Sequence, residues 1–127
     1  MCKLKFACYY FEMAIAFARI SYHSRSQGHS AVAGAAYRAG IELKDHRTGE
    51  IHNFKNRSDV IYSEVLLPEG AARQFKNRET LWNAVEAAEA RKNSQIAKDI
   101  VLALPRDLDL SLQIDLARNF ANTHFIR

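Results

Sequence analysis

One phenol, that of Tyr37, lies in an alanine-rich segment that is typical of a short helix. Ser30 suits the N-cap because its hydroxyl can accept a free amide of the first turn, and Gly40 suits a left-handed C-terminal stop. Helical spacing places small residues on the face of Tyr37, namely Ser30, Ala33 and Gly34. A ring beside so bare a surface is either covered by another element or presented to a large substrate.

An acidic group is the second candidate for chemistry. Asp99 opens the β-rich run Ile100–Leu104, and a carboxylate at the edge of a buried strand could accept the proton of a tyrosine or orient a metal ligand. A plain ion pair with Lys98 or Arg91 is the alternative. Both alternatives stay open on the sequence.

Basic groups could contact the phosphates of a nucleic acid. The candidates are Arg19, Arg25, Arg38, Arg91 and Lys92. Ser30 and the backbone amides from Gly28 to Ala31 could hold an anion at the helix start. Such groups position a strand without reading its sequence, and for each one a plain surface charge is the alternative. Trp82 could stack on a base or belong to the core.

The histidines and cysteines form no local metal motif. No two of the five histidines are spaced i, i+2 or i, i+4, as ligands on one strand or one helix would be. Cys2 and Cys8 make neither a zinc signature nor a disulfide framework, which favours a reducing compartment. The sequence therefore predicts no metal ligands within these residues.

The remaining segments predict the elements that must position these groups. The predicted strands are Ala14–Ser21, a hairpin of Ile41–Lys44 and Ile51–Phe54 turning at Gly49, Val60–Leu67, and Ile96–Leu104 with a buried second half. The predicted helices are the tyrosine helix, one capped by Asn77 and running to about Arg91, and one capped by Asp109 with Leu110, Ile114, Ala117 and Ala121 on one face.

Two glutamates on the middle helix could belong to an acidic cluster with Asp99. We expect Glu86 to lie on a solvated helix face, and we leave Glu89 open. Tyr22 and Tyr62 fall in strand-like runs and are expected to pack.

Composition sets limits on the class. The chain has 127 residues, enough for one domain, with 48% hydrophobic and 25% charged residues. Its formal net charge of +4 is compatible with nucleic acid but is weak evidence alone. The order of elements predicts an α+β fold. No stretch is long and apolar enough for a membrane span, and we expect a cytoplasmic protein.

Several motifs in order resemble the MobA/MobL family of plasmid mobilisation relaxases. The similarity begins at Met13. Its segments are Ser24–Gly40, Asp45–Glu50, Tyr62–Pro68, Leu81–Glu86, Glu89–Asp99 and Ala103–Pro105.

This resemblance implies the relaxase fold, an antiparallel sheet flanked by helices, with a His-hydrophobic-His metal motif on a later strand. That motif is absent here. The resemblance therefore indicates that residues 13–127 are the N-terminal part of a relaxase domain, C-terminally truncated, and that residues 1–12 are an extension outside the family pattern.

The resemblance also implies a chemistry. The residue matching Tyr37 is the nucleophile that nicks one DNA strand, with Mn²⁺ or Mg²⁺ polarising the phosphate because a phenol of pKa ~10 is a weak nucleophile at neutral pH. Members of the family commonly have glutamate at the position of Asp99. The aspartate side chain is one methylene shorter than that of glutamate. We expect no tight metal binding by this chain, and an inactive fragment.

The partners implied are single-stranded transfer-origin DNA, the relaxosome and type IV secretion coupling proteins. An unpaired sheet edge could lead to self-association. Two alternatives to a relaxase fragment stay open: a metal-independent module that binds single-stranded DNA, and a decayed gene product.

Overall fold

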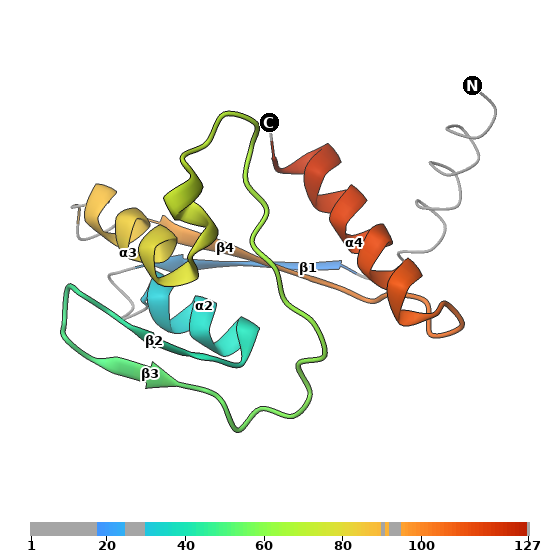
Figure 1. Cartoon of the computed structure of the whole chain (residues 1–127), viewed down its shortest axis with the longest axis horizontal. Coiled ribbons are helices and arrows are strands. Elements are labelled where there is room, and N and C mark those ends of the chain that lie inside the picture. Colours follow the sequence, from blue (N-terminus) through green and yellow to red (C-terminus); the bar gives the residue numbers. More distant parts are fainter. Residues whose placement is uncertain (1–17, 25–29, 90, 92–94, 127) are drawn as a thin grey trace. The chain divides into compact units, whose positions relative to one another are not determined.

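The computed structural model describes residues 18–24, 30–89, 91 and 95–126. The described residues of Tyr22–Asp99 form one compact unit, and the described residues of Met1–Ser21 and Ile100–Arg127 form another. The elements in chain order (Figure 1) are β1 (Ala18–Ser24), α2 (Ala31–Ala39), β2 (Glu42–Lys44), β3 (Ile51–Asn53), η2 (Arg73–Lys76), α3 (Arg78–Ala88), β4 (Gln95–Leu102) and α4 (Leu110–His124).

Helix α2 has the boundaries that its caps predict. The Ser30 hydroxyl accepts a hydrogen bond from the Ala33 amide at 3.2 Å, and Ser30 itself is extended. Gly40 ends the helix with φ 65° and ψ 42°, the left-handed region that favours glycine. A Cβ at Gly40 would also lie 3.2 Å from a methyl group of Val60. Both predicted caps are therefore confirmed.

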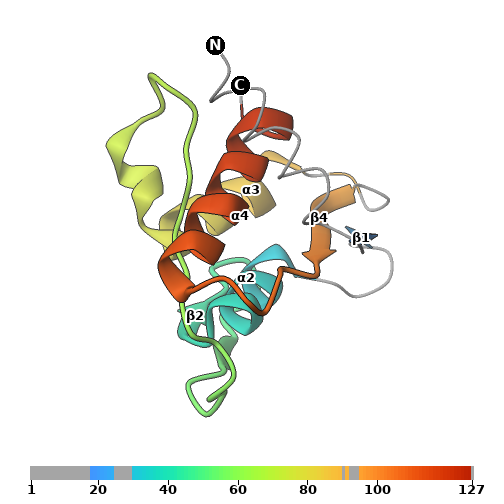
Figure 2. The same ribbon diagram turned by 90° about the vertical axis from the view of Figure 1, so that its right-hand side faces the viewer.

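The predicted hairpin is confirmed as well. Strands β2 and β3 pair antiparallel with Leu43 opposite His52, and Gly49 in the connection has φ 77°. The backbone amide of Asp45 donates to Glu50 at 2.8 Å and so closes the turn. The hairpin lies against α2, which is visible in Figures 1 and 2.

The core of the unit Tyr22–Asp99 lies between α2 and this hairpin. Val32, Ala36 and Leu43 are buried together. Partly buried apolar side chains pack around them, namely Ala35, Ile41, Phe54 and Trp82. Small residues on α2 let the hairpin approach its backbone closely, so the alanine-rich sequence serves packing on one side of the helix.

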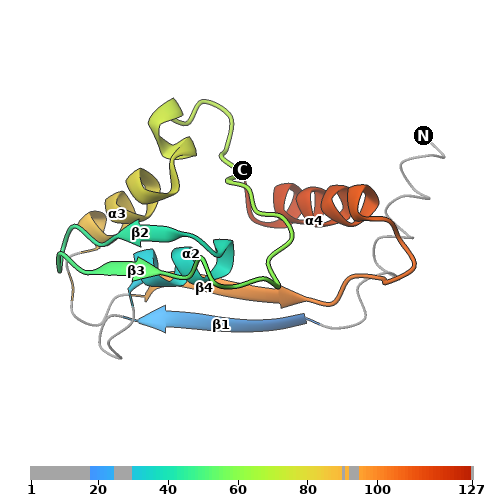
Figure 3. The same cartoon turned by 60° about the horizontal axis from the view of Figure 1, so that its bottom comes forward.

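Strand β1 pairs with β4 in a second two-stranded sheet, and the arrows of the two strands run in opposite directions in Figure 3. The predicted strand began at Ala14, and its residues 14–17 lie outside the described part of the chain. Strand β4 ends at Leu102 rather than at Leu104. Its second half is not buried as predicted, since Val101 is exposed. The structure is thus a mixed α and β arrangement with small antiparallel sheets.

One predicted strand and one predicted helix end are wrong. Val60–Leu67 does not form a strand, because loose apolar alternation alone supplies no pairing partner, and Ile61 is 76% exposed. Helix α3 starts after the predicted cap Asn77, whose side chain accepts from Thr80, but it ends at Ala88 rather than near Arg91. Glu89 has left the helical region at φ −104° and ψ 88°.

In the other unit, Asp109 caps α4 as predicted and accepts from the Leu112 amide at 2.9 Å. The predicted apolar face is covered only in part: Leu110 is exposed, whereas Ile114, Ala117 and Ala121 are half-buried. Among the helices of the described residues, none combines the length and apolarity that crossing a bilayer requires.

Candidate functional site

The N-terminal end of α2 is fixed by a buried carboxylate from the hairpin. Asp45 has no exposed surface, and its Oδ2 accepts from the Ser30 hydroxyl at 2.8 Å. Its Oδ1 accepts from the Arg47 amide at 3.0 Å. Burial by itself raises the pKa of Asp45, but hydrogen bonds from Ser30 and Arg47, together with the Arg47 charge, hold it below its ordinary value.

A second carboxylate reaches the same helix end from α3. Glu86 Oε1 accepts from the Ala31 amide at 2.6 Å, and its Oε2 lies 3.6 Å from Arg47 Nε. Glu86 is 3% exposed, so the expectation of a solvated helix face is wrong. The reason is that the first amide of α2 needs an acceptor and the helix dipole favours an anion there. The chain itself thus supplies an anion at the helix start, where the sequence had left room for a bound one.

Tyr37 lies near the other end of α2. Its side chain is 41% exposed, and its ring makes a T-shaped contact with Phe54 at 5.3 Å between centroids. Two guanidinium groups flank the ring: Arg57 at 3.9 Å and Arg38 at 5.0 Å from the centroid. The ring therefore packs against Phe54 and Arg57 while part of the residue stays exposed.

Asp99 pairs with the residue that follows Tyr37. Arg38 Nε donates to Asp99 Oδ1 at 3.0 Å, and Arg38 Nη2 donates to Asp99 Oδ2. This hydrogen bonding raises the pKa of Arg38, against partial burial, which lowers it. His23 Nε2 lies 3.9 Å from Asp99 Oδ2. The ion pair expected as an alternative exists, but its cation is Arg38 rather than Lys98 or Arg91.

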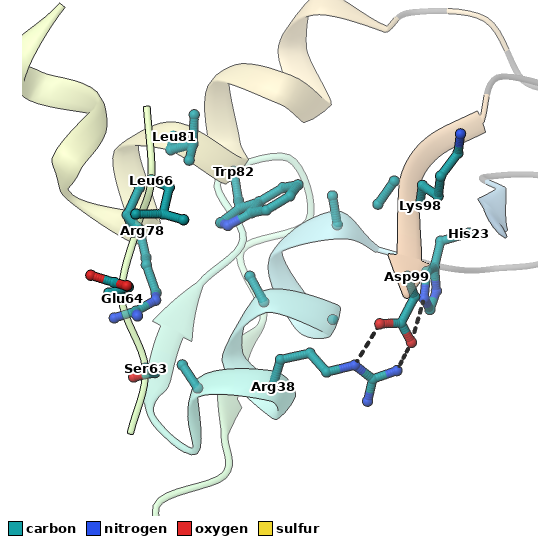
Figure 4. A pocket seen from close by; sticks show the side chains of 16 residues that line it. His23, Arg38, Ser63, Glu64, Leu66, Arg78, Leu81, Trp82, Lys98 and Asp99 are labelled. Atoms are coloured by element: carbon teal, nitrogen blue, oxygen red, sulfur yellow. Dashed lines mark hydrogen bonds and ion pairs between the residues drawn. The ribbon is translucent and has the colours of Figure 1, made fainter. Parts of the chain in front are cut away.

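A cavity of about 300 Å³ opens beside this ion pair (Figure 4). One wall is the small-residue surface of α2, and Gly34 has nothing within 4 Å of where a Cβ would stand. The opposite walls carry Trp82, Arg78 and Lys98. Trp82 both packs against the core and lines this cavity. Tyr37 does not line this cavity. The cavity therefore lies beside Arg38 and Asp99 and not over the phenol of Tyr37.

Of the four other arginine and lysine residues expected to contact DNA, the structure describes two. Arg25 and Lys92 lie outside the described residues. Arg91 is exposed and lies 3.8 Å from Glu89, and Arg19 is exposed on β1. Among residues 18–24, 30–89, 91 and 95–126, no three histidine, cysteine or acidic side chains converge as metal ligands would.

Sequence reasoning missed several residues that build the site. Arg57 lies between two predicted strands, in a segment for which the sequence predicts no element, and Glu86 was expected on a solvated face rather than buried. Asn83 of α3 also holds the hairpin, accepting from the His46 amide and donating to the Lys44 carbonyl. Only Asp45, directly before a predicted turn, offered a local signal.

Comparisons with known proteins define the class of the chain. The sequence model of the MobA/MobL family matches residues 29–127. The chain belongs to the MobA/MobL family. It is 39% identical over 98 residues to "Mobilization protein MobL" of Acidithiobacillus ferridurans, covering 77% of this chain and 25% of that protein. It is 32% identical over 124 residues to "Conjugal transfer protein TraA" of Agrobacterium fabrum, covering 90% of this chain and 11% of that protein.

A solved structure agrees with the fold. The structure described as "Molecular Basis of Vancomycin Resistance Transfer in Staphylococcus aureus" superposes with a TM-score of 0.81 at 37% identity. The match covers 87% of this chain and 56% of that one. The chain spans a quarter or less of the length of these two curated relatives.

Proposed function

We propose that this chain is the tyrosine-bearing part of a relaxase that nicks one strand of plasmid DNA at a transfer origin. The observation that carries the proposal is the half-exposed phenol of Tyr37 between two guanidinium groups, in a chain of the MobA/MobL family. Exposure lets a large substrate reach the ring. Of the two guanidinium groups, that of Arg38 offers a cation to the polyanion, whereas Arg57 is engaged within the chain.

The proposed reaction is a transesterification. Tyr37 Oη loses its proton and attacks a backbone phosphorus in line, forming a tyrosyl–phosphate ester. One ester bond between phosphorus and a sugar oxygen breaks, and that sugar oxygen takes up a proton. The number of ester bonds is unchanged, so the reverse reaction can rejoin the strand without an external energy source.

Asp99 and Arg38 act as a pair in this proposal. Both carboxylate oxygens of Asp99 face the Arg38 guanidinium, which supports a role in orienting neighbouring groups over a role as the proton acceptor. Arg38, at the end of α2 next to the phenol, is then placed to contact a phosphate of the bound strand. Ser30 is placed at the buried end of α2 instead, where it caps the helix.

The described residues do not fit a divalent metal. His23 and Asp99 lie 3.9 Å apart, Asp99 is engaged by Arg38, and among the described residues no third histidine, cysteine or acidic side chain joins them as a metal ligand. No step is therefore assigned to a metal here. We propose that ligands for Mn²⁺ or Mg²⁺ come from elsewhere in the complete protein, consistent with the small share of the relatives that this chain spans.

The partners follow from the same proposal. They are single-stranded transfer-origin DNA in the cytoplasm, together with the relaxosome and the secretion coupling proteins that receive the strand. The resemblance in the sequence begins at Met13 and the family model matches residues 29–127, so we further propose that residues 1–12 are dispensable. A chain starting at Met13 should bind DNA and melt as residues 1–127 do.

Binding tests the proposal first. Strands selected from a random single-stranded library by this chain should bind with an affinity that falls steeply as salt rises, and more tightly than their duplex forms. Binding without an adduct in any longer version of the protein would favour the metal-independent binding module. Binding no tighter than that of an unrelated protein of equal charge would contradict both.

A further inference from the structure

Arg57 makes two contacts with Tyr37. It lies in the irregular segment after β3, and its guanidinium carbon stands 3.9 Å from the centroid of the Tyr37 ring. Its Nη1 donates to the backbone carbonyl of Tyr37 at 2.7 Å. That carbonyl is one of the last in α2, where a helix leaves acceptors unsatisfied. One side chain therefore holds both the ring and the backbone of the same residue.

Asp59 fixes the guanidinium in turn. Arg57 Nε donates to Asp59 Oδ1 at 3.1 Å, and Arg57 Nη2 donates to Asp59 Oδ2. This pairing raises the pKa of Arg57 and lowers that of Asp59. All three guanidinium nitrogens thus have a partner within the chain. A guanidinium so engaged is poorly placed to bind a phosphate, and its plane is set by Asp59.

Phe54 limits the ring from another direction. Its ring meets that of Tyr37 at an interplanar angle of 87°, and its carbonyl accepts from the Arg57 amide at 3.1 Å. The short stretch from Phe54 to Asp59 therefore supplies the stacking cation, the ion-pair partner of that cation and an aromatic edge. A helix cap would need only Nη1, so the position of the guanidinium over the Tyr37 ring is an additional feature.

We propose that Arg57 is a positioning residue for the Tyr37 phenol, held in place by Asp59. The inference rests on the proposed function, because it gives the fixed ring a purpose: the hydroxyl oxygen keeps one direction relative to an incoming phosphate. Positioning matters because a misplacement of about 1 Å can cost about 100-fold in rate.

The ring itself supplies a test that needs no activity. In ¹³C-resolved NMR of the chain, the Arg57 side-chain protons should be shifted upfield by the ring current of Tyr37. Arg57→Ala should move the Tyr37 ring signals and speed its ring flips, and Arg57→Lys and Asp59→Asn should do so to a smaller extent. Arg73→Ala, which removes an exposed arginine of η2, is the matched control. Unmoved Tyr37 signals in all three variants would overturn the proposal.

Kinetics supply the second readout. In a longer protein that forms a tyrosyl–DNA adduct, Arg57→Ala should slow single-turnover adduct formation by about 10- to 100-fold with unchanged affinity for the strand. A parallel loss of affinity would show that Arg57 contacts DNA and would overturn the positioning role. If the unaltered protein forms no adduct, the proposed function fails, while the NMR result still decides whether Arg57 orients the ring.

Discussion

The two ends of α2 are built on opposite principles. At the N-terminal end, buried Glu86 accepts from the Ala31 amide, and buried Asp45 accepts from the hydroxyl of the cap residue Ser30. At the other end, Tyr37 and Arg38 are exposed and held by surface ion pairs and ring contacts. Buried charges are costly to disturb, whereas exposed pairs contribute little to stability. The helix is anchored by buried carboxylates at one end and exposed at the other, which is where the proposed nucleophile lies.

Removing Glu86 should have the largest effect on stability. Glu86→Ala leaves the Ala31 amide and the Arg47 guanidinium without this acceptor, and we expect a loss of about 3 kcal/mol of unfolding free energy. Urea denaturation measures it, with Glu69→Ala, an exposed carboxylate, as the control. Equal effects of the two substitutions would show that the buried anchor is not what holds this end.

The second prediction concerns pH. Because the pKa of Asp45 is lower when folded than its ordinary value of 3.8, its charge stabilises the fold above that value. Asp45→Asn should cost about 1–2 kcal/mol at neutral pH. The difference should shrink as the pH falls through and below about 4. Thermal melting at several pH values measures this, and a difference that grows on acidification would contradict the sign.

Alanine substitutions at two glycines, one at the C-terminal end of α2 and one within it, should have opposite effects on stability. Gly40→Ala forces a side chain into φ 65° and against Val60, and we expect a loss of about 1–2 kcal/mol. Gly34 is an interior position of α2, and a Cβ there would meet nothing within 4 Å. Gly34→Ala should therefore raise the unfolding free energy by about 0.5–1 kcal/mol. Denaturation of both variants tests the pair, and effects of the same sign would show that the helix end is not set as described.

The smallest effect on stability is expected for Arg38→Ala, because the Arg38 side chain of this ion pair is half-exposed. Its effect should appear in DNA binding instead. If Arg38 contacts one phosphate, the slope of log affinity against log salt should fall by about one unit. Asp99→Asn, which removes a negative charge beside Arg38, should strengthen binding. An unchanged slope in Arg38→Ala would place the strand elsewhere.

The parts of this architecture that depend on local chemistry were predictable from the sequence. The caps Ser30, Gly40, Asn77 and Asp109 and the hairpin turning at Gly49 are each specified by neighbouring residues. A cap is a contact over three or four positions, so a single sequence contains the information. Val60–Leu67 failed because a strand requires a partner that alternation does not identify.

The candidate site was predictable only in part, because its contacts are distant in sequence. Glu86 and Ala31 are 55 positions apart, and Arg38 and Asp99 are 61 apart. Nothing in the local pattern of either pair indicates its partner. Arg57 reaches Tyr37 across 20 positions from a segment that predicts no element. The resemblance to MobA/MobL relaxases singled out Tyr37, whereas the groups that hold it emerged only from the fold.

The most direct test is whether Tyr37 becomes covalently attached to DNA. Residues 1–127 would be joined to the region that follows the matching segment in the Acidithiobacillus ferridurans MobL relative, then incubated with a selected single strand and Mn²⁺. Intact-mass spectrometry should show a protein–DNA adduct that maps to Tyr37 and disappears in Tyr37→Phe. An adduct that persists in Tyr37→Phe would contradict the account.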